Sequence, residues 1–217
     1  MKYPVVVGSN CCAGNFYHNY LNTAFYSPFI WSVVPYDSIL NLISMWDKID
    51  WGDIRIVPNP TREFTLTLQL NKIADIHYVH YFWSDKYSTP YAKGASIFYC
   101  DIHKYLLNKY KERVSRMLRE GNVETPIFII HEEEYANEKN GNVLPEIMKL
   151  DTPYKRIIIT HSSNLSSFKT NENCLYIYDS NKMLPEPMIL KHGDEIAAFC
   201  GLDKNDYIKS DMILSAQ

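Results

Sequence analysis

Short β-branched runs that alternate with helix-like segments are the feature of this sequence that most constrains its fold. Residues 5–7, 127–130 and 157–160 are apolar at nearly every position, which is typical of strands buried on both faces of a parallel sheet. Regular alternation of such runs with helical patterns predicts an α/β fold. We expect a three-layer, Rossmann-like variant, in which helices cover both faces of a mostly parallel sheet with some antiparallel additions. The run at 5–7 is expected to lie inside this sheet.

Helical spacing of apolar residues predicts the helices of this fold. The segments with this spacing are residues 16–25, 39–46, 102–118, 143–148 and 195–200. Ser27-Pro28 is expected to end the first helix, Asp37-Ser38 to cap the second, and Gly121 to end the third. A chain of 217 residues can bury a core without disulfides, so we expect one domain over residues 1–217.

Other segments have strand-like or loop-like patterns. Residues 64–70 alternate apolar and polar side chains, which predicts a half-buried antiparallel strand near the edge of a sheet. Residues 73–82, 175–178 and 188–190 are also expected to be strands. Residues 84–95 are rich in Gly, Pro and polar side chains and predict a long loop.

Composition excludes several classes of protein. The chain has 22 Lys and Arg against 25 Asp and Glu, and this net charge of −3 argues against nucleic-acid binding. No apolar run approaches the roughly 20 residues that span a bilayer. The five cysteines form no CxxC pair, so we expect neither a zinc ribbon nor a disulfide framework. These observations predict a cytoplasmic protein with reduced thiols, and no pattern identifies a metal or a cofactor.

Polar residues follow the apolar runs where the predicted strands end. These residues are Ser9, Asn10, Cys11 and Cys12 after the first strand, and His80 and Tyr81, His131 and Glu132, Thr160 and His161, and Asp179 after later strands. Ligands of open α/β sheets bind beyond the carboxyl ends of the strands. If the strands are parallel, these polar groups therefore share one edge of the sheet.

Cys12 lies in the turn between the first strand and the first helix. A thiol at a helix N-terminus meets free backbone N–H groups and the positive end of the helix dipole, which favours the thiolate. Cys12 is then an accessible nucleophile and Cys11 an ordinary or buried thiol. Alternatively the N–H groups hold a phosphate or carboxylate, which the small Gly14 would let approach. The remaining interpretation is that both cysteines are small hydrophobes that pack a tight turn.

Histidines and arginines supply further candidates. His80, His131 and His161 follow apolar strands and could each act as a general base or metal ligand, or each could instead satisfy a strand-end carbonyl. His18, six residues after Cys12, could face the same turn or point away from it. Arg113 and Arg116 lie beside the apolar stripe of the predicted helix at 102–118. There each guanidinium could form a bidentate salt bridge with the carboxylate of Asp37 or Glu63, or could remain solvated.

Several of these residues occur in an order that resembles a known family. The first part of the chain is similar to an S-N-N-C-W-G-G opening followed by a tyrosine, a histidine and S-P. The matching residues are Ser9-Asn10-Cys11-Cys12-Ala13-Gly14, then Phe16-Tyr17-His18, then Ser27-Pro28. That opening belongs to a bacterial family of unknown function whose members are commonly labelled exopolysaccharide biosynthesis proteins. His80-Tyr81 resembles a later H-Y pair of that family, and residues 110–117 resemble its W-x-x-R-x-x-R-I/M helix. Cys11, Ala13 and Asn15 depart from the pattern.

The resemblance implies an α/β fold and a place in surface-polysaccharide pathways, but no established reaction. Aligned in this way, Cys12 falls on the family cysteine and Asp37 on an acidic position. The expected catalytic residues are Cys12, His18 and His80. The expected ligand-binding residues are Ser9, Asn10, Gly14, Tyr17, Asp37, Tyr81, Arg113 and Arg116. We expect Ser9, Asn10, Cys12, His18 and His80 to lie in one pocket.

Three functions remain open at this point. The first is an enzyme, preferably a transferase, that acts on a sugar or sugar phosphate in polysaccharide assembly. The second is a cysteine-dependent hydrolase or acyl transferase with Cys12 as its nucleophile. The third is a non-catalytic accessory protein that binds carbohydrate.

Overall fold

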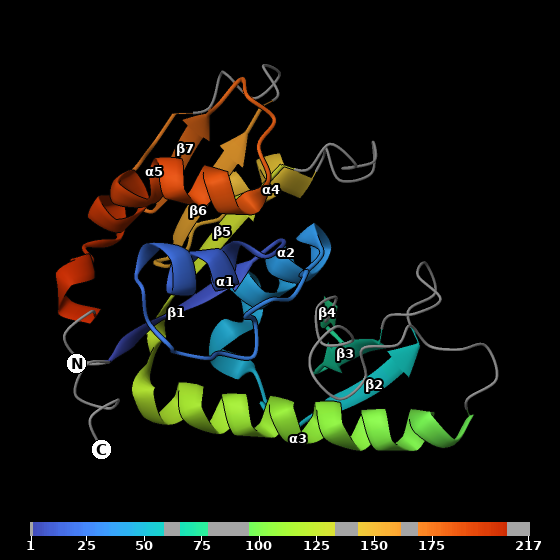
Figure 1. Cartoon of the computed structure of the whole chain (residues 1–217). Helices are drawn as coiled ribbons and strands as arrows, with labels where there is room; N and C mark the ends of the chain where they lie inside the picture. The colour runs from blue at the N-terminus through green and yellow to red at the C-terminus, as the bar shows by residue number, and fades with distance from the viewer. Residues whose placement is uncertain (1, 59–65, 78–95, 133–142, 162–168, 208–217) are drawn as a thin grey trace.

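A computed structural model describes residues 2–58, 66–77, 96–132, 143–161 and 169–207 of the chain (Figure 1). Its elements in chain order are β1 (Tyr3–Gly8), α1 (Cys12–Asn15), the π-helical turn η1 (Phe16–Tyr20), α2 (Tyr36–Met45), the 3₁₀ turn η2 (Trp46–Lys48), β2 (Ile54–Pro58), β3 (Leu66–Leu70), β4 (Ala74–His77), α3 (Ser96–Glu120), β5 (Gly121–His131), α4 (Val143–Lys149), β6 (Lys155–Thr160), β7 (Cys174–Tyr178) and α5 (Pro185–Cys200).

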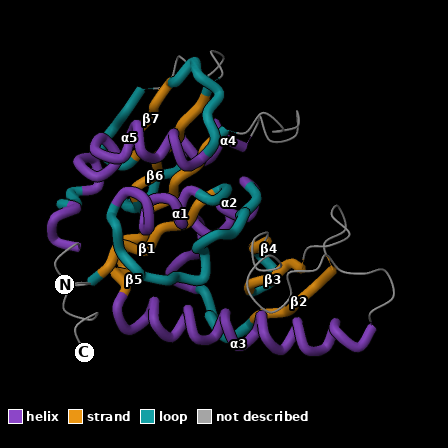
Figure 2. The backbone as a smooth tube through the Cα atoms, viewed as in Figure 1, coloured by secondary structure: helices purple, strands orange, loops and turns teal. Residues whose placement is uncertain are grey.

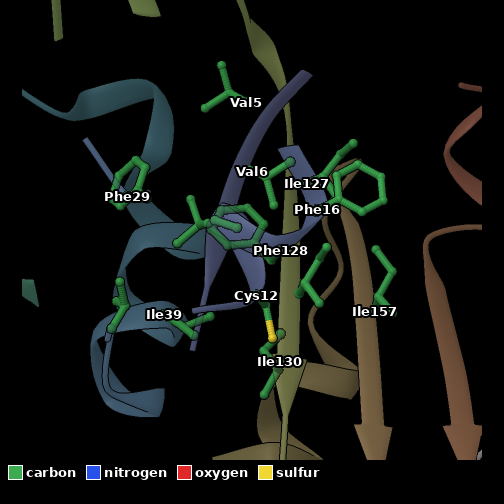
Figure 3. Close-up of a cluster of buried hydrophobic side chains, with 14 of the residues drawn as sticks. Val5, Val6, Cys12, Phe16, Phe29, Ile39, Ile127, Phe128, Ile130 and Ile157 are labelled. Atoms are coloured by element: carbon green, nitrogen blue, oxygen red, sulfur yellow. The ribbon is translucent and has the colours of Figure 1, made fainter. Parts of the chain in front are cut away.

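The main sheet is parallel and has the order β1-β5-β6-β7. The three apolar runs of the sequence lie in β1, β5 and β6, and the side chains of residues 5–7, 127–130 and 157–159 are at most 4% exposed. Continuous burial is possible because both faces of the sheet are covered. Figure 3 shows Phe29 and Ile39 on one side of β5 and Phe16 on the other. The predicted α/β class with a mostly parallel sheet is confirmed.

The first strand lies at one end of this sheet, so the expectation that it lies inside the sheet is wrong. It is nevertheless buried along its whole length. The Tyr17 hydroxyl accepts a hydrogen bond from the Val6 N–H at 2.7 Å and donates to the Pro4 carbonyl at 2.6 Å. A single side chain thus satisfies two backbone groups of β1 that a further strand would otherwise pair.

A second, antiparallel sheet has the order β2-β3-β4. The predicted antiparallel character of residues 64–70 is confirmed for β3. Within this sheet β3 lies between β2 and β4, one strand in from either edge. β2 was not predicted from the sequence; its Ile54 and Ile56 are only half-buried. Figure 2 shows this sheet beside the long helix α3 and apart from the parallel sheet.

Several predicted helices have different limits in the structure. The helix expected over residues 16–25 consists of α1 and η1 alone, and the chain leaves it at Asn22, whose φ is +51°. α2 begins at Tyr36 behind Pro35, one residue before the expected cap at Asp37-Ser38. The long α3 does end directly before Gly121, as predicted.

The strand expected at residues 188–190 is wrong, because these residues lie in α5. This helix also contains the predicted turns at 195–200. It begins with Pro185 in its first turn, where a missing N–H costs no intrahelical bond. It ends at Gly201, whose φ of +68° is the left-handed conformation that favours glycine. Its contacts with α1 and η1 place α5 over that side of the sheet.

Candidate functional site

The carboxyl ends of the four parallel strands meet at one edge, called here the carboxyl edge (Figure 1). Its described residues are Ser9 and Asn10 after β1, His131 and Glu132 at the end of β5, Thr160 and His161 at the end of β6, and Asp179 after β7. Backbone hydrogen bonds continue one residue beyond the strands, from Glu132 N–H to Ile159 (2.8 Å) and from Asp179 N–H to Thr160 (2.9 Å). The described members of the expected set therefore lie at one edge of the sheet, while His80 and Tyr81 lie outside the described residues.

Ser9 and Tyr36 fix the backbone of His131. The Ser9 hydroxyl accepts from the His131 N–H at 3.0 Å and donates to the His131 carbonyl at 3.3 Å. The Tyr36 hydroxyl, from the first turn of α2, donates to the same carbonyl at 2.8 Å. All three residues are buried. The end of β5 is thereby tied both to β1 and to α2.

Asn10 connects the first turn to the His131 ring. Its Oδ1 accepts from the Cys12 backbone N–H at 3.2 Å and from the Cys12 thiol at 2.6 Å. Its Nδ2 lies 3.1 Å from His131 Nδ1. Burial, with a smaller effect of the nearby His161, lowers the pKa of His131 to about 4, and Glu132 partly opposes this shift. His131 is therefore neutral at physiological pH.

Glu132 organises the next part of the carboxyl edge. Its Oε2 accepts hydrogen bonds from the Thr160 hydroxyl and from the His161 backbone N–H, the latter at 3.2 Å. The His161 Nδ1 lies 3.9 Å from the same oxygen. Both side chains retain some contact with solvent, at 19% exposure for His161 and 17% for Glu132. This places an imidazole and a carboxylate together where a ligand can reach them.

Asp179 and helix α5 form the far part of the carboxyl edge. The Asp179 Oδ2 accepts from Lys191 Nζ at 2.5 Å and from His192 Nε2 at 2.8 Å. Its Oδ1 accepts from the Asn181 backbone and side chain. The hydrogen bonds from Lys191 and His192 lower the pKa of Asp179 well below its ordinary value. Asp179 is thus an ionised, fully engaged anchor between β7 and α5.

Cys12 is 0% exposed and belongs to the core (Figure 3). The expectation that Cys12 is the more accessible of the two thiols is wrong, since Cys11 is the one that is partly exposed. A nucleophile must be reachable by its substrate, so burial favours the interpretation of Cys12 as a small side chain packing a tight turn. The Cys12 N–H, expected as part of an anion cradle, is taken up by Asn10, and α1 has only four residues.

Alkylation of the folded protein is accordingly expected to modify Cys11 and to leave Cys12 unmodified. The reason is steric access, because a thiol with no exposed surface reacts only when the turn opens. Peptide mapping by mass spectrometry after a brief treatment with iodoacetamide measures both positions. A urea-unfolded sample, in which both thiols react, is the control. Labelling of Cys12 at the rate of Cys11 in the folded protein would restore the nucleophile interpretation.

His18, in η1, lies in a second group of residues that includes Arg113 of α3. Its ring packs edge-on against Tyr26 and Trp31, with centroids 5.3 and 5.5 Å away. Burial and the charge of Arg113 lower the pKa of His18. Its Nε2 is buried and has no hydrogen-bond partner among the described residues. Its described contacts are thus with this group, while Ser9, Asn10 and Cys12 gather around His131.

Arg113 and Arg116 belong to the same group. Arg113 is 9% exposed, and its Nη1 donates to the Ile30 carbonyl at 3.3 Å. Arg116 donates to the Ala24 carbonyl at 3.0 Å and to Glu120 at 2.8 Å. Asp37 and Glu63 were the candidate carboxylate partners of these two arginines; the carboxylate bonded to Arg116 is instead Glu120, one turn along α3, and Glu63 lies outside the described residues. Both guanidinium groups also lie over the Tyr26 ring, at 5.7 and 5.8 Å.

The remaining predicted site residues are dispersed. Tyr17 is buried with its hydroxyl on β1, and Asp37 is exposed in the first turn of α2. His80, Tyr81 and Glu63 lie outside the described residues. Two cavities of about 340 and 330 Å³ lie elsewhere, one at the amino ends of β1, β5 and β6 and one beside η2.

Gly14 has a packing role that the sequence did not indicate. A Cβ at this position would lie 2.5 Å from Cδ2 of the Trp31 ring, so the indole rests directly on the glycine. We expect Gly14→Ala to lower the free energy of unfolding by about 1–3 kcal/mol, because the ring must move. Chemical denaturation measures this change. In a Trp31→Ala background the same substitution should cost little, and an equal cost in both backgrounds would contradict the explanation.

Some residues of the carboxyl edge were expected at strand ends but were not among the expected catalytic or ligand-binding residues. Their position after apolar runs was the signal in the sequence that could have identified them as site residues. These residues are His131, Glu132, Thr160, His161 and Asp179. Lys191, His192 and Tyr36 had no such signal, because their places depend on how α5 and α2 pack.

Comparisons of this chain with protein-family models, with curated proteins and with solved structures found no match. The described part of the chain contains no cluster of three or more His, Cys, Asp or Glu side chains that could hold a metal ion. Within the same residues, every helix is too short or too polar to cross a membrane.

Proposed function

We propose that this chain binds a sugar or sugar phosphate at the carboxyl edge and transfers a sugar unit during assembly of a bacterial surface polysaccharide, in the cytoplasm. The observation that carries the proposal is the convergence there of amide, imidazole, hydroxyl and carboxylate groups from Asn10, His131, Thr160, His161 and Glu132. Such donors and acceptors suit a polyhydroxylated ligand. The resemblance of residues 9–18 to exopolysaccharide biosynthesis proteins supports the choice of ligand.

The pair of His161 and Glu132 suits the proton transfer that a sugar transferase needs. In the proposed step, His161 takes the proton of an acceptor hydroxyl while its oxygen attacks the anomeric carbon of the donor. The bond from that carbon to the leaving phosphate oxygen breaks, and the phosphate departs with the electron pair. Glu132, fixed by Thr160 and by the His161 backbone, stabilises the imidazolium that forms.

Ligand binding tests this function most directly. Calorimetric titrations with glucose, glucose 1-phosphate and uridine diphosphate glucose are expected to detect binding of at least one of them. Glu132→Gln should weaken that binding about tenfold or more, since it removes a charged hydrogen-bond partner. Glu124→Gln, the same substitution at an exposed position earlier in β5, should have no effect.

The outcomes separate the three functions. Absence of binding of all three compounds at about 10 mM would reject a sugar site at the carboxyl edge. Binding without release of phosphate or nucleotide in the presence of acceptor sugars would identify an accessory protein in place of a transferase. Turnover that depends on Cys12 and not on His161 would favour the cysteine-dependent enzyme.

A further inference from the structure

The orientation of the Asn10 side chain is determined by its hydrogen-bond partners. Both the backbone N–H and the thiol of Cys12 are donors, so the atom that receives them must be the amide oxygen. The amide nitrogen then necessarily faces the His131 ring, 3.1 Å from Nδ1. The turn that contains Cys12 therefore decides which end of Asn10 the histidine meets.

This orientation determines the tautomer of His131. An amide nitrogen can only donate, so Nδ1 must be the unprotonated nitrogen that accepts. The single proton of the neutral ring then lies on Nε2. Burial, which keeps the pKa of His131 at about 4, opposes a second proton.

Hydrogen bonds also hold the backbone of His131 in place. Its backbone is bonded to Ser9 through both the N–H and the carbonyl, and to Tyr36 through the carbonyl. His131 is only 7% exposed. His161 and Glu132 are close enough to influence its charge, which places the ring next to the proposed acid–base pair.

From this geometry we infer that His131 serves the carboxyl edge as a neutral, fixed-tautomer hydrogen-bond donor through Nε2–H, and that Asn10 is the positioning residue that sets it. The role as a donor to a ligand oxygen rests on the proposed function. The two histidines of the carboxyl edge then divide the work: His131 donates a hydrogen bond to a sugar hydroxyl or phosphate oxygen, and His161 accepts a proton. A ring with its proton on Nε2 and its lone pair bound to Asn10 has no free nitrogen with which to act as a base.

Nitrogen NMR of the histidine ring tests the tautomer without any ligand. In ¹⁵N-labelled protein, long-range proton–nitrogen correlations should show His131 protonated on Nε2 alone from about pH 8 down to about pH 5. Asn10→Asp keeps an acceptor for Cys12 and places a carboxylate beside Nδ1. It should move the proton to Nδ1 and raise the pKa of His131 by about 1 to 3 pH units.

Two further variants test whether these changes depend on the contact between Asn10 and His131. Asn122→Asp adds the same charge at the other end of β5, where Asn122 bonds Thr125, and should leave the His131 spectrum unchanged. Asn10→Ala removes the donor and should give a mixture of both tautomers. A wild-type ring protonated on Nδ1, or one that titrates near its ordinary pKa of about 6.5, would overturn the inference.

Ligand titration separates this inference from the proposed function. Adding glucose 1-phosphate to the labelled protein should shift the Nε2–H signal of His131, because the donor gains an oxygen partner. Inorganic phosphate in a parallel titration shows whether the phosphate group alone suffices. A correct tautomer with no shift for either compound would leave the Asn10–His131 arrangement standing and reject the sugar-phosphate ligand. A wrong tautomer would reject the arrangement whatever binds.

Discussion

Replacing Tyr17 with phenylalanine is expected to lower the free energy of unfolding by about 2–4 kcal/mol, although only one oxygen atom is removed. That oxygen accepts from the Val6 N–H at 2.7 Å and donates to the Pro4 carbonyl at 2.6 Å, and Tyr17 is 0% exposed. The variant leaves two backbone groups of β1 buried without a partner. Each such group costs roughly 1–3 kcal/mol when water cannot reach it.

Urea denaturation measures this loss, and hydrogen exchange locates it. The Val6 amide should exchange faster in Tyr17→Phe, while amides in the centre of the sheet change only through the lower global stability. Tyr178→Phe is the matched control, because Tyr178 is 51% exposed, and its stability should equal that of the wild type. An unchanged stability of Tyr17→Phe would mean that water or a neighbouring group replaces the hydroxyl, and the explanation for a buried end strand would fail.

The parallel sheet could be predicted from the sequence because burial on both faces leaves a simple pattern. Residues 127–130 and 157–159 are continuous apolar runs, and they form the central strands β5 and β6. The position of β1 at one end could not be predicted in the same way. An end strand normally leaves backbone groups of its outer edge unpaired, but here the Tyr17 hydroxyl bonds two of them, and the strand is buried like an inner one.

Short apolar segments led to the errors in secondary structure. Met188, Ile189 and Leu190 are compatible with a strand or with one side of a helix, and only the length of α5 decides between them. The aromatic residues of η1 have helical spacing, but the π-turn and the left-handed Asn22 end the helix early.

The candidate site could be predicted only as far as strand ends reveal it. Asn10 and Glu132 lie within three residues of the ends of apolar runs, so their common edge follows from the parallel topology. The emphasis on His18 came from the resemblance and from its proximity to Cys12 in sequence. The structure shows that His131, 119 residues from Cys12 in the chain, is the histidine bonded to that turn through Asn10. The strand-end pattern places both residues at one edge of the sheet, but it does not predict the hydrogen bonds that join them.

Because of His131, the free energy of unfolding is expected to decrease steeply as the pH falls below about 6.5. Its pKa is about 4 in the folded state, against about 6.5 in an unfolded chain, so the unfolded state binds more protons between these values. The stabilisation from the neutral ring is therefore fully present above about pH 6.5 and is lost as the pH falls towards 4. Since one pKa unit is worth about 1.4 kcal/mol, the loss between about pH 7.5 and pH 4.5 is roughly 2–3 kcal/mol.

His131→Asn isolates this contribution from that of other groups that titrate in the same range. An asparagine oxygen at the position of Nδ1 still accepts from Asn10, but it has no proton to gain. Urea denaturation of both proteins at about pH 7.5 and pH 4.5 should show that the variant loses roughly 2–3 kcal/mol less than the wild type over this interval. Equal losses in the two proteins would mean that His131 is protonated without cost in the folded state, and hence that burial does not hold it neutral.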